Sequence, residues 1–361
     1  MTERHRVIFI DLARALAVIL MVAGHTSSAL LSKAYRESPW FDAWDFQRGL
    51  TSGLFLLLSG FAFSIATTRH WPLHLYPSPA VLKRARRFVL FILLGYALHF
   101  PVPHAAELAS ATEQQWRSFL AIDVLQLIGV TLLMLQALVL ITRSREVFMA
   151  AAFVLAAGLT LGAPAAWRTD WASMMPPALA HYLSPSEGSL FPLFPWAAYI
   201  FIGAGAGQVY ARWGAAHLGR FATWGMVAPG AVLVTLGFTV VTGVVGEVAI
   251  RTGSCLLVLG VIAHASRRIG QLPHIFGAIG QESLTIYFVH LCIVYGSIWN
   301  TGLARFYGES LSLTATLLTA TVLVSAMVAL GWQWNRLKHV RPLAARRLAV
   351  ASLAILAVRL L

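Results

Sequence analysis

The chain has 361 residues, of which 58% are hydrophobic and only 11% are charged. This composition excludes an ordinary soluble globular protein and predicts an all-α, polytopic membrane helix bundle. The formal net charge of +13 is also seen in nucleic-acid-binding proteins, but the positions of the charges favour membrane topology as its cause. The cysteines Cys255 and Cys292 lie in apolar segments, which excludes a disulfide framework and gives no zinc-ligand spacing.

Hydropathy predicts about ten membrane-spanning helices in a single domain, with its core over residues 8–335 and a basic tail over 336–361. The predicted spans are 8–31, 47–68, 86–100, 119–142, 146–163, 190–211, 223–246, 249–266, 279–299 and 311–334. In the tail, Leu348–Leu361 is apolar but short, which favours an interfacial helix over an eleventh span. Asp11 and Arg14 interrupt the apolar run that a cleavable signal peptide needs, so the first span is expected to be retained.

The first span carries three ionisable residues, Asp11, Arg14 and His25. On a helix they fall within one stripe about 80° wide. His25 lies about 16 Å along the axis from Arg14. Ionisable groups in a membrane are costly and usually face a bundle interior or a cavity, so this stripe predicts a functional site. The alternative is a structural ion pair between Asp11 and Arg14, with His25 as a packing residue.

The distribution of basic residues predicts the orientation. With a cytoplasmic N-terminus, 19 of the 27 Lys and Arg residues fall on inner segments and 7 on outer loops, while Arg14 lies within the first span. The positive-inside bias therefore predicts ten spans with both termini in the cytoplasm of a bacterial-type inner membrane. The inner cluster Lys83–Arg87 would bind anionic lipid headgroups, or equally a phosphate-bearing cofactor.

Several later positions add to this pattern. Ser59-Gly60 in the second span indicates close helix packing, and two prolines in Phe191–Trp196 predict an irregular start to the sixth span. In the ninth span Ser283, Tyr287 and His290 share one helix face, which would put a second imidazole near the midplane.

Four motifs resemble those of the acyltransferase type 3 membrane family. Asp11-Leu-Ala-Arg14, ten residues and then His25 is similar to the D-x-x-R-x10-H signature that opens that family. Phe55–Phe61, Arg84–Arg87 and Ser283–His290 resemble its F-x-x-L-S-G-F, R-x-x-R and S-x-x-x-Y-x-x-H segments. Arg86–His99, Leu125–Leu133 and Phe191–Trp196 look closer to the heparan-α-glucosaminide N-acetyltransferase-like branch of the same transmembrane acyltransferase superfamily. Ser38 stands where the eukaryotic-type enzymes of that branch have a His before Pro-Trp, which leaves His25 as the candidate.

The resemblance implies transfer of an acyl group, most often acetyl, from cytoplasmic acyl-CoA to a sugar hydroxyl or amine on the far side of the membrane. His25 would act as general base or acyl carrier, together with Arg14 and Asp11. The donor would be held by Arg14, Ser59, Lys83, Arg84 and Arg87, and the acceptor by Asp45, Arg48, Asp123, Gln126 and His290. No metal and no nucleic acid are expected. The alternative from another class is a small-molecule transporter that uses the Asp11, Arg14 and His25 stripe as its substrate or proton site.

Overall fold

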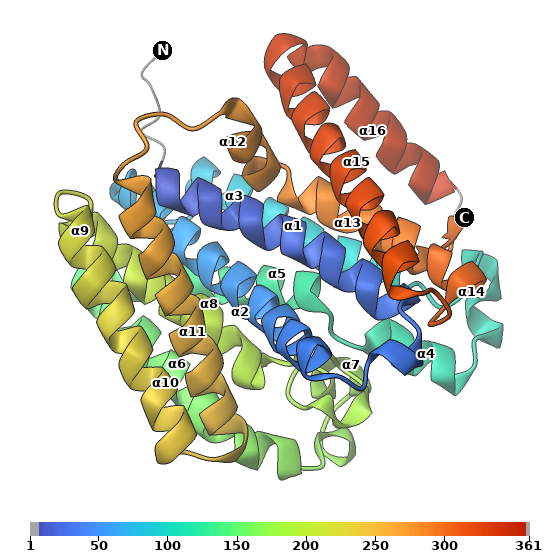
Figure 1. Ribbon diagram of the computed structural model, residues 1–361, viewed down its shortest axis with the longest axis horizontal. Helices are drawn as coiled ribbons and strands as arrows, with labels where there is room; N and C mark the ends of the chain where they lie inside the picture. Colours follow the sequence, from blue (N-terminus) through green and yellow to red (C-terminus); the bar gives the residue numbers. More distant parts are fainter. Residues whose placement is uncertain (1–6, 359–361) are drawn as a thin grey trace. The chain divides into compact units, whose positions relative to one another are not determined.

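The computed structural model describes residues 7–358, and they form α-helices joined by turns, as the composition predicts (Figure 1). Within these residues the strands are limited to one short antiparallel pair, β1 (Gly296–Ser297) and β2 (Asn300–Thr301). Arg4, Arg6 and Arg359 were counted in the predicted orientation and lie outside the described residues.

The helices cover most of the chain. The longer ones are α1 (Ile8–Leu30), α2 (Pro39–Thr68), α3 (Pro79–Leu98), α5 (Val124–Thr142), α6 (Arg145–Arg168), α8 (Leu193–Val209), α10 (Ala228–Thr239), α11 (Gly243–Ser266), α13 (Ser283–Val294), α15 (Leu313–Val340) and α16 (Pro342–Val358). Shorter ones are η2 (Trp71–His74), α4 (Glu113–Leu120), α7 (Pro177–Ala180), η6 (Tyr210–Gly214), α9 (Leu218–Arg220), η7 (Phe221–Val227), α12 (His274–Gln281) and α14 (Leu303–Tyr307).

Among residues 7–358, seven helices are long and apolar enough to cross a membrane: α1, α2, α5, α6, the continuous segment Leu218–Thr239, α11 and α15. The bent pair α12 and α13 would make an eighth. The other two predicted spans also contain helices, but α8 has only 17 residues and α3 carries the basic cluster Lys83–Arg87 in its first half. The chain is therefore an all-α protein with seven or eight candidate spans, and the count of ten with both termini inside stays a prediction.

The span predicted over residues 279–299 contains a break near its start. Helix α12 ends at Gln281, α13 begins at Ser283, and the two are bent by 69°. Glu282 lies at the break with only 3% of its surface exposed, and it accepts hydrogen bonds from Lys338 Nζ (2.7 Å) and Asn335 Nδ2 (2.9 Å). A break in a helix at membrane depth is tolerated when it is buried in protein. Here the paired carboxylate of Glu282 stabilises the bend between α12 and α13.

The chain divides into two compact units, each described here by itself. The first takes its described residues from 1–52, 98–116 and 270–361. In it α1 packs against α12, α13, α14 and α15, and α16 lies along α15 (Figure 1). The indole of Trp299 donates a hydrogen bond of 3.1 Å to the carbonyl of Leu356 near the end of α16. Whether α16 is interfacial or spanning stays a prediction, as does the single domain.

The second unit comprises residues 53–97 and 117–269, with α8 packed on α5 and α6, and α10 on α11. The second part of α2 crosses α8 in backbone contact. A Cβ added to Gly60 would lie 1.8 Å from the carbonyl oxygen of Ile200, and one added to Gly203 would lie 1.9 Å from that of Leu57. Only glycine fits at such a crossing, so the close packing predicted at Ser59-Gly60 is confirmed. The irregular start of the sixth span is also confirmed, because Phe194 in α8 has non-helical angles.

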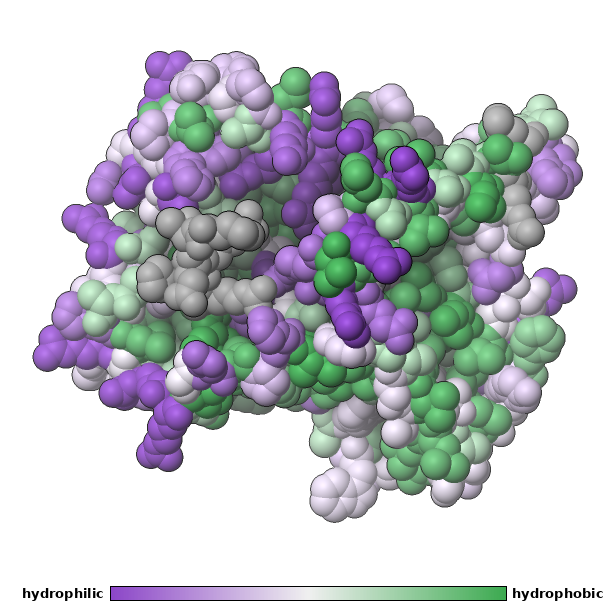
Figure 2. Space-filling view, turned by 90° about the horizontal axis from the view of Figure 1, so that it is seen from above, coloured by the Kyte–Doolittle hydropathy of each residue, from purple (hydrophilic) through white to green (hydrophobic). Residues whose placement is uncertain are grey.

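Much of the surface is apolar. Ile141, Val154, Val322 and Ile355 are each more than 60% exposed, and Figure 2 shows broad hydrophobic areas beside hydrophilic side chains on one face. Apolar patches of this extent normally mark a surface that is covered by lipid or protein. Together with the long apolar helices, they make the chain an integral membrane protein.

Candidate active site

Helix α1 carries the predicted ionisable stripe into the interior of the first unit. Val18 and Val22, which lie between Arg14 and His25 on that stripe, are 2% and 1% exposed. Near its start, a Cβ added to Gly280 of α12 would meet the Cβ of Arg14 at 3.2 Å. The stripe therefore faces protein, and Arg14 lies against the helix that ends at the Glu282 break.

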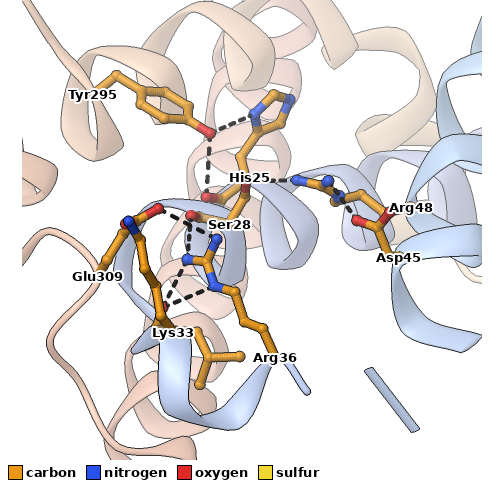
Figure 3. A network of polar contacts seen from close by, with 9 residues as sticks. His25, Ser28, Lys33, Arg36, Asp45, Arg48, Tyr295 and Glu309 are labelled. Carbon is orange, nitrogen blue, oxygen red and sulfur yellow. Dashed lines mark hydrogen bonds and ion pairs between the residues drawn. The ribbon is translucent and has the colours of Figure 1, made fainter. Parts of the chain in front are cut away.

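His25 is half-buried and is held by a residue from the far end of the chain (Figure 3). Its Nδ1 lies 3.2 Å from the phenol oxygen of Tyr295, which follows α13, and the same phenol donates to the His25 carbonyl at 3.4 Å. A phenol has one hydrogen, so when that hydrogen goes to the carbonyl, Nδ1–H must donate to the phenol oxygen. In that tautomer Nε2 carries the basic lone pair.

A second imidazole lies beside the first. The rings of His25 and His290 have their centroids 5.2 Å apart, and His290 is completely buried. Its Nδ1 is 2.8 Å from the carbonyl of Ile286, which only accepts, so Nδ1 carries the hydrogen and Nε2 of the neutral ring is the basic atom. Tyr287 packs edge-on against His290 at 5.5 Å. The structure thus unites two predicted site residues that are 265 positions apart.

Arg48 and Asp45, two predicted acceptor-side residues, also lie at this site. Arg48 of α2 donates to the hydroxyl of Ser28 and to the carboxylate of Asp45, both at 2.5 Å (Figure 3). Its methylene carbons pass over Gly24, where an added Cβ would meet Cγ of Arg48 at 3.2 Å. A guanidinium is therefore fixed at Ser28, one turn along α1 from His25.

Hydrogen bonds and ion pairs also fix the C-terminal end of α1, next to the Arg48 guanidinium. Arg36 donates to the carbonyls of Ser28 (3.0 Å) and Leu31 (2.7 Å), which the helix leaves without intrahelical partners. Glu309, in the turn before α15, pairs with Arg36 at 3.3 Å and Lys33 at 3.4 Å (Figure 3). These contacts give the loop after α1 a fixed course. Tyr295, Ser28 and Glu309 were missed by the sequence interpretation, since no motif marks them.

The predicted donor residues other than Arg14 belong to the second unit. Lys83 and Arg87 are exposed, with the Arg87 guanidinium 5.7 Å from the Phe91 ring. Arg84 differs, because it donates to Thr67 Oγ1 at 2.7 Å and lies 5.0 Å from the Phe63 ring. Ser59 donates to the carbonyl of Phe55 in its own helix at 2.8 Å. Arg84 thus makes structural contacts within the second unit, whereas the positive charges of Lys83 and Arg87 are accessible to a ligand.

In the loop between α2 and α3, burial lowers the pKa of His74. His74 is 5% exposed, and its carbonyl lies within 3.4 Å of the Gln136 amide nitrogen. Desolvation, followed by repulsion from Arg84 and His70, lowers the pKa of His74 to about 4. His74 is therefore neutral at physiological pH.

Asp123 and Gln126 lie at the start of α5 in the second unit. Asp123 is the N-cap residue, and its Oδ1 accepts from the backbone N–H of Val124 at 2.7 Å. Gln126 is fully buried, and neither of its amide atoms has a hydrogen-bond partner among the described residues. Helix capping is a sufficient structural reason for an aspartate at this position.

Among residues 7–358 no group of three or more His, Cys, Asp or Glu side chains is arranged to hold a metal ion.

One family model matches the sequence. The family described as heparan-alpha-glucosaminide N-acetyltransferase, catalytic, matches residues 6–241, which is well over half of the chain. The matched range contains the α1 stripe and Arg48, whereas His290 and Tyr295 lie beyond it. A comparison with curated proteins gave no match. The resemblance to this branch is confirmed, and the resemblance to the acyltransferase type 3 family stays a prediction.

Proposed function

The chain belongs to the heparan-alpha-glucosaminide N-acetyltransferase catalytic family, and from that premise we propose that it transfers an acetyl group from acetyl-CoA to a sugar. Membership of the family implies an acetyltransferase in a membrane. The CoA donor, a sugar amine or hydroxyl as acceptor, and transfer from the cytoplasm to the far side are our proposals.

The observation that carries this assignment is the environment of His25. A half-buried imidazole with one nitrogen fixed by Tyr295, a second imidazole 5.2 Å away and a guanidinium on the next turn form a group suited to proton transfer. A neutral imidazole is the commonest general base in enzymes because its pKa lies near the working pH.

In this mechanism Nε2 of His25 takes a proton from the acceptor amine or hydroxyl as that group attacks the thioester carbonyl. A carbon–nitrogen or carbon–oxygen bond forms, and the tetrahedral intermediate then collapses with cleavage of the carbon–sulfur bond. The imidazolium returns its proton to the departing CoA thiolate, so no other reactant is needed. His290 lies where it would share the proton or orient the acceptor, and Arg48 with Asp45 would bind sugar hydroxyls.

An acyl-histidine intermediate is a variant of the same proposal. In it Nε2 attacks the thioester carbonyl, the carbon–sulfur bond breaks, and CoA leaves as the thiolate. The acceptor amine or hydroxyl then takes the acetyl group from Nε2, which breaks the carbon–nitrogen bond to the ring, and the proton that the acceptor loses neutralises the thiolate.

Arg14 and the exposed cations Lys83 and Arg87 are the donor-side candidates. Arginine and lysine bind phosphate through charge-assisted hydrogen bonds, and CoA carries phosphates on its nucleotide end. Arg84 and Ser59 also belong to this proposed set, although Arg84 donates to Thr67 and Ser59 to its own helix, and Asp11 would act together with Arg14.

The test is acetyl transfer by the purified protein in sealed vesicles. Labelled acetyl-CoA is supplied on one side and a glucosamine-terminated oligosaccharide on the other, with a glucose-terminated analogue to separate amine from hydroxyl acceptors. Single cysteines at Tyr76, which is 52% exposed, and at Ser110 report which side each loop faces. Labelled product on the acceptor side supports the proposal. Movement of the sugar across the membrane without acetylation would favour the alternative function as a transporter. The break between α12 and α13 is the observation that favours this alternative.

A further inference from the structure

A small polar pocket lies in the second unit, outside every residue assigned above. It has a volume of about 90 Å³ and is formed where α2 ends, α6 begins and α8 gives way to η6. Its polar lining consists of Thr68, Arg145, Glu146, Gln208 and Arg212. This volume is several times the roughly 10–15 Å³ that one buried water needs, so the pocket has room for a tetrahedral oxyanion of five heavy atoms.

Arg145 is held in place at the rim. Its Nη2 donates to the carbonyl of Thr68 at 3.3 Å, and its guanidinium lies 5.6 Å from the ring of Trp71. One hydrogen bond and one aromatic face fix the group, while most of its five N–H donors remain for a ligand.

Gln208 supplies a donor that the protein itself does not use. The side chain is 4% exposed, and its Oε1 accepts from the Thr68 hydroxyl at 3.2 Å. Its Nε2 is buried and has no hydrogen-bond partner among the described residues. An unsatisfied buried amide is costly and rare, and Gln208 lines the pocket, so an acceptor bound there would satisfy this N–H group.

The charges favour an anion. Glu146 is the one carboxylate in the lining, and it pairs with Arg212 at 3.6 Å, both side chains being more than 60% exposed. A surface pair of this kind is weak, so a ligand with more negative charge would compete with the Glu146 carboxylate for Arg212. The exposed Arg69 follows Thr68 and adds a further positive charge at this end.

We propose that this pocket binds a phosphate group through Arg145, Arg212 and the Nε2 of Gln208. A phosphate presents several strong acceptors in a tetrahedral arrangement, and two guanidinium groups with one amide donor match them. The phosphate can come from the nucleotide end of CoA or from an anionic lipid headgroup. The predicted orientation puts Arg69, Arg145 and Arg212 on the cytoplasmic side, where both are present.

The experiment uses the full chain in neutral detergent with three probes: inorganic phosphate, CoA against CoA lacking its 3′-phosphate, and phosphatidylglycerol against phosphatidylcholine. Affinity is read from the ligand-induced rise of the unfolding midpoint. Arg212→Gln and Gln208→Leu should each raise the dissociation constant for inorganic phosphate about tenfold or more. Arg268→Gln removes the same charge from an exposed site outside the pocket and should change it less than twofold.

The other probes identify the source. If CoA is the ligand, Arg212→Gln removes the difference between CoA and its form lacking the 3′-phosphate. If a lipid is the ligand, CoA binding is unchanged and the preference for phosphatidylglycerol is lost. The proposal is overturned if both pocket variants bind all three probes as Arg268→Gln does. Because every readout is binding, a failure of acetyl transfer leaves this test intact.

Discussion

Replacing His25 with alanine tests the proposed mechanism most directly. The change removes a half-buried ring and its contact with Tyr295, which as a neutral hydrogen bond contributes about 1 kcal/mol to stability. Domain stability is typically about 5–15 kcal/mol, so the variant should still fold and insert. A positioned general base contributes about 10²–10⁴ to rate. At about 1.4 kcal/mol per tenfold, the barrier should therefore rise by about 3–5 kcal/mol.

The assay is single-turnover transfer from labelled acetyl-CoA, with CoA affinity and the unfolding midpoint measured on the same preparation. His339→Ala is the matched control, because His339 is exposed on α15 and its Nδ1 lies 2.7 Å from the Asn335 carbonyl one turn away. His290→Ala is not a neutral control, since that ring lies 5.2 Å from His25, and it should also lower transfer. Tyr295→Phe keeps the ring but loses the hydroxyl, so transfer should fall about fivefold to tenfold.

The reasoning is refuted if His25→Ala transfers acetyl groups at the parent rate in correctly folded protein. His25 would then be a packing residue. Acyl-protein that still accumulates in the variant would place the nucleophile elsewhere.

Three further results are expected. Arg87→Gln should weaken CoA binding about tenfold and make it less sensitive to salt. Arg84→Gln should in addition lower the free energy of unfolding by about 1–3 kcal/mol, because it breaks the contact with Thr67. Equal effects of the two variants on both binding and stability would contradict the structural difference between Arg84 and Arg87. Gly60→Ala should destabilise the protein by more than about 3 kcal/mol, because its Cβ would meet the Ile200 carbonyl at 1.8 Å. Gly158→Ala, with nothing within 4 Å, should stabilise it by up to about 1 kcal/mol. Because the pKa of His74 is about 4 when folded and 6.5 as a free group, protonation favours the unfolded chain. Stability should be full above about pH 6.5 and fall by up to about 3 kcal/mol towards pH 4, a slope that His74→Gln should flatten in unfolding midpoints measured across this range.

Local physics in the sequence determined several features. The long apolar runs required membrane helices, and the helical period placed Asp11, Arg14 and His25 on one face of α1 before any partner was known. Gly60 beside Ser59 predicted a close helix crossing, which the contact with Ile200 confirms. Each of these predictions used only residues within a few turns of one helix.

Tertiary structure alone decided what surrounds His25. Lipid solvates every apolar helix face equally, so hydrophobicity does not specify which face meets which partner, and the choice rests on small residues and polar contacts between distant segments. For that reason no motif predicted that Tyr295 would contact the ring, and the prediction of His290 as a second imidazole did not specify that it lies beside His25. The break at Glu282 is hidden in the same way, because the carboxylate that it buries is paired by Lys338, which lies 56 positions later.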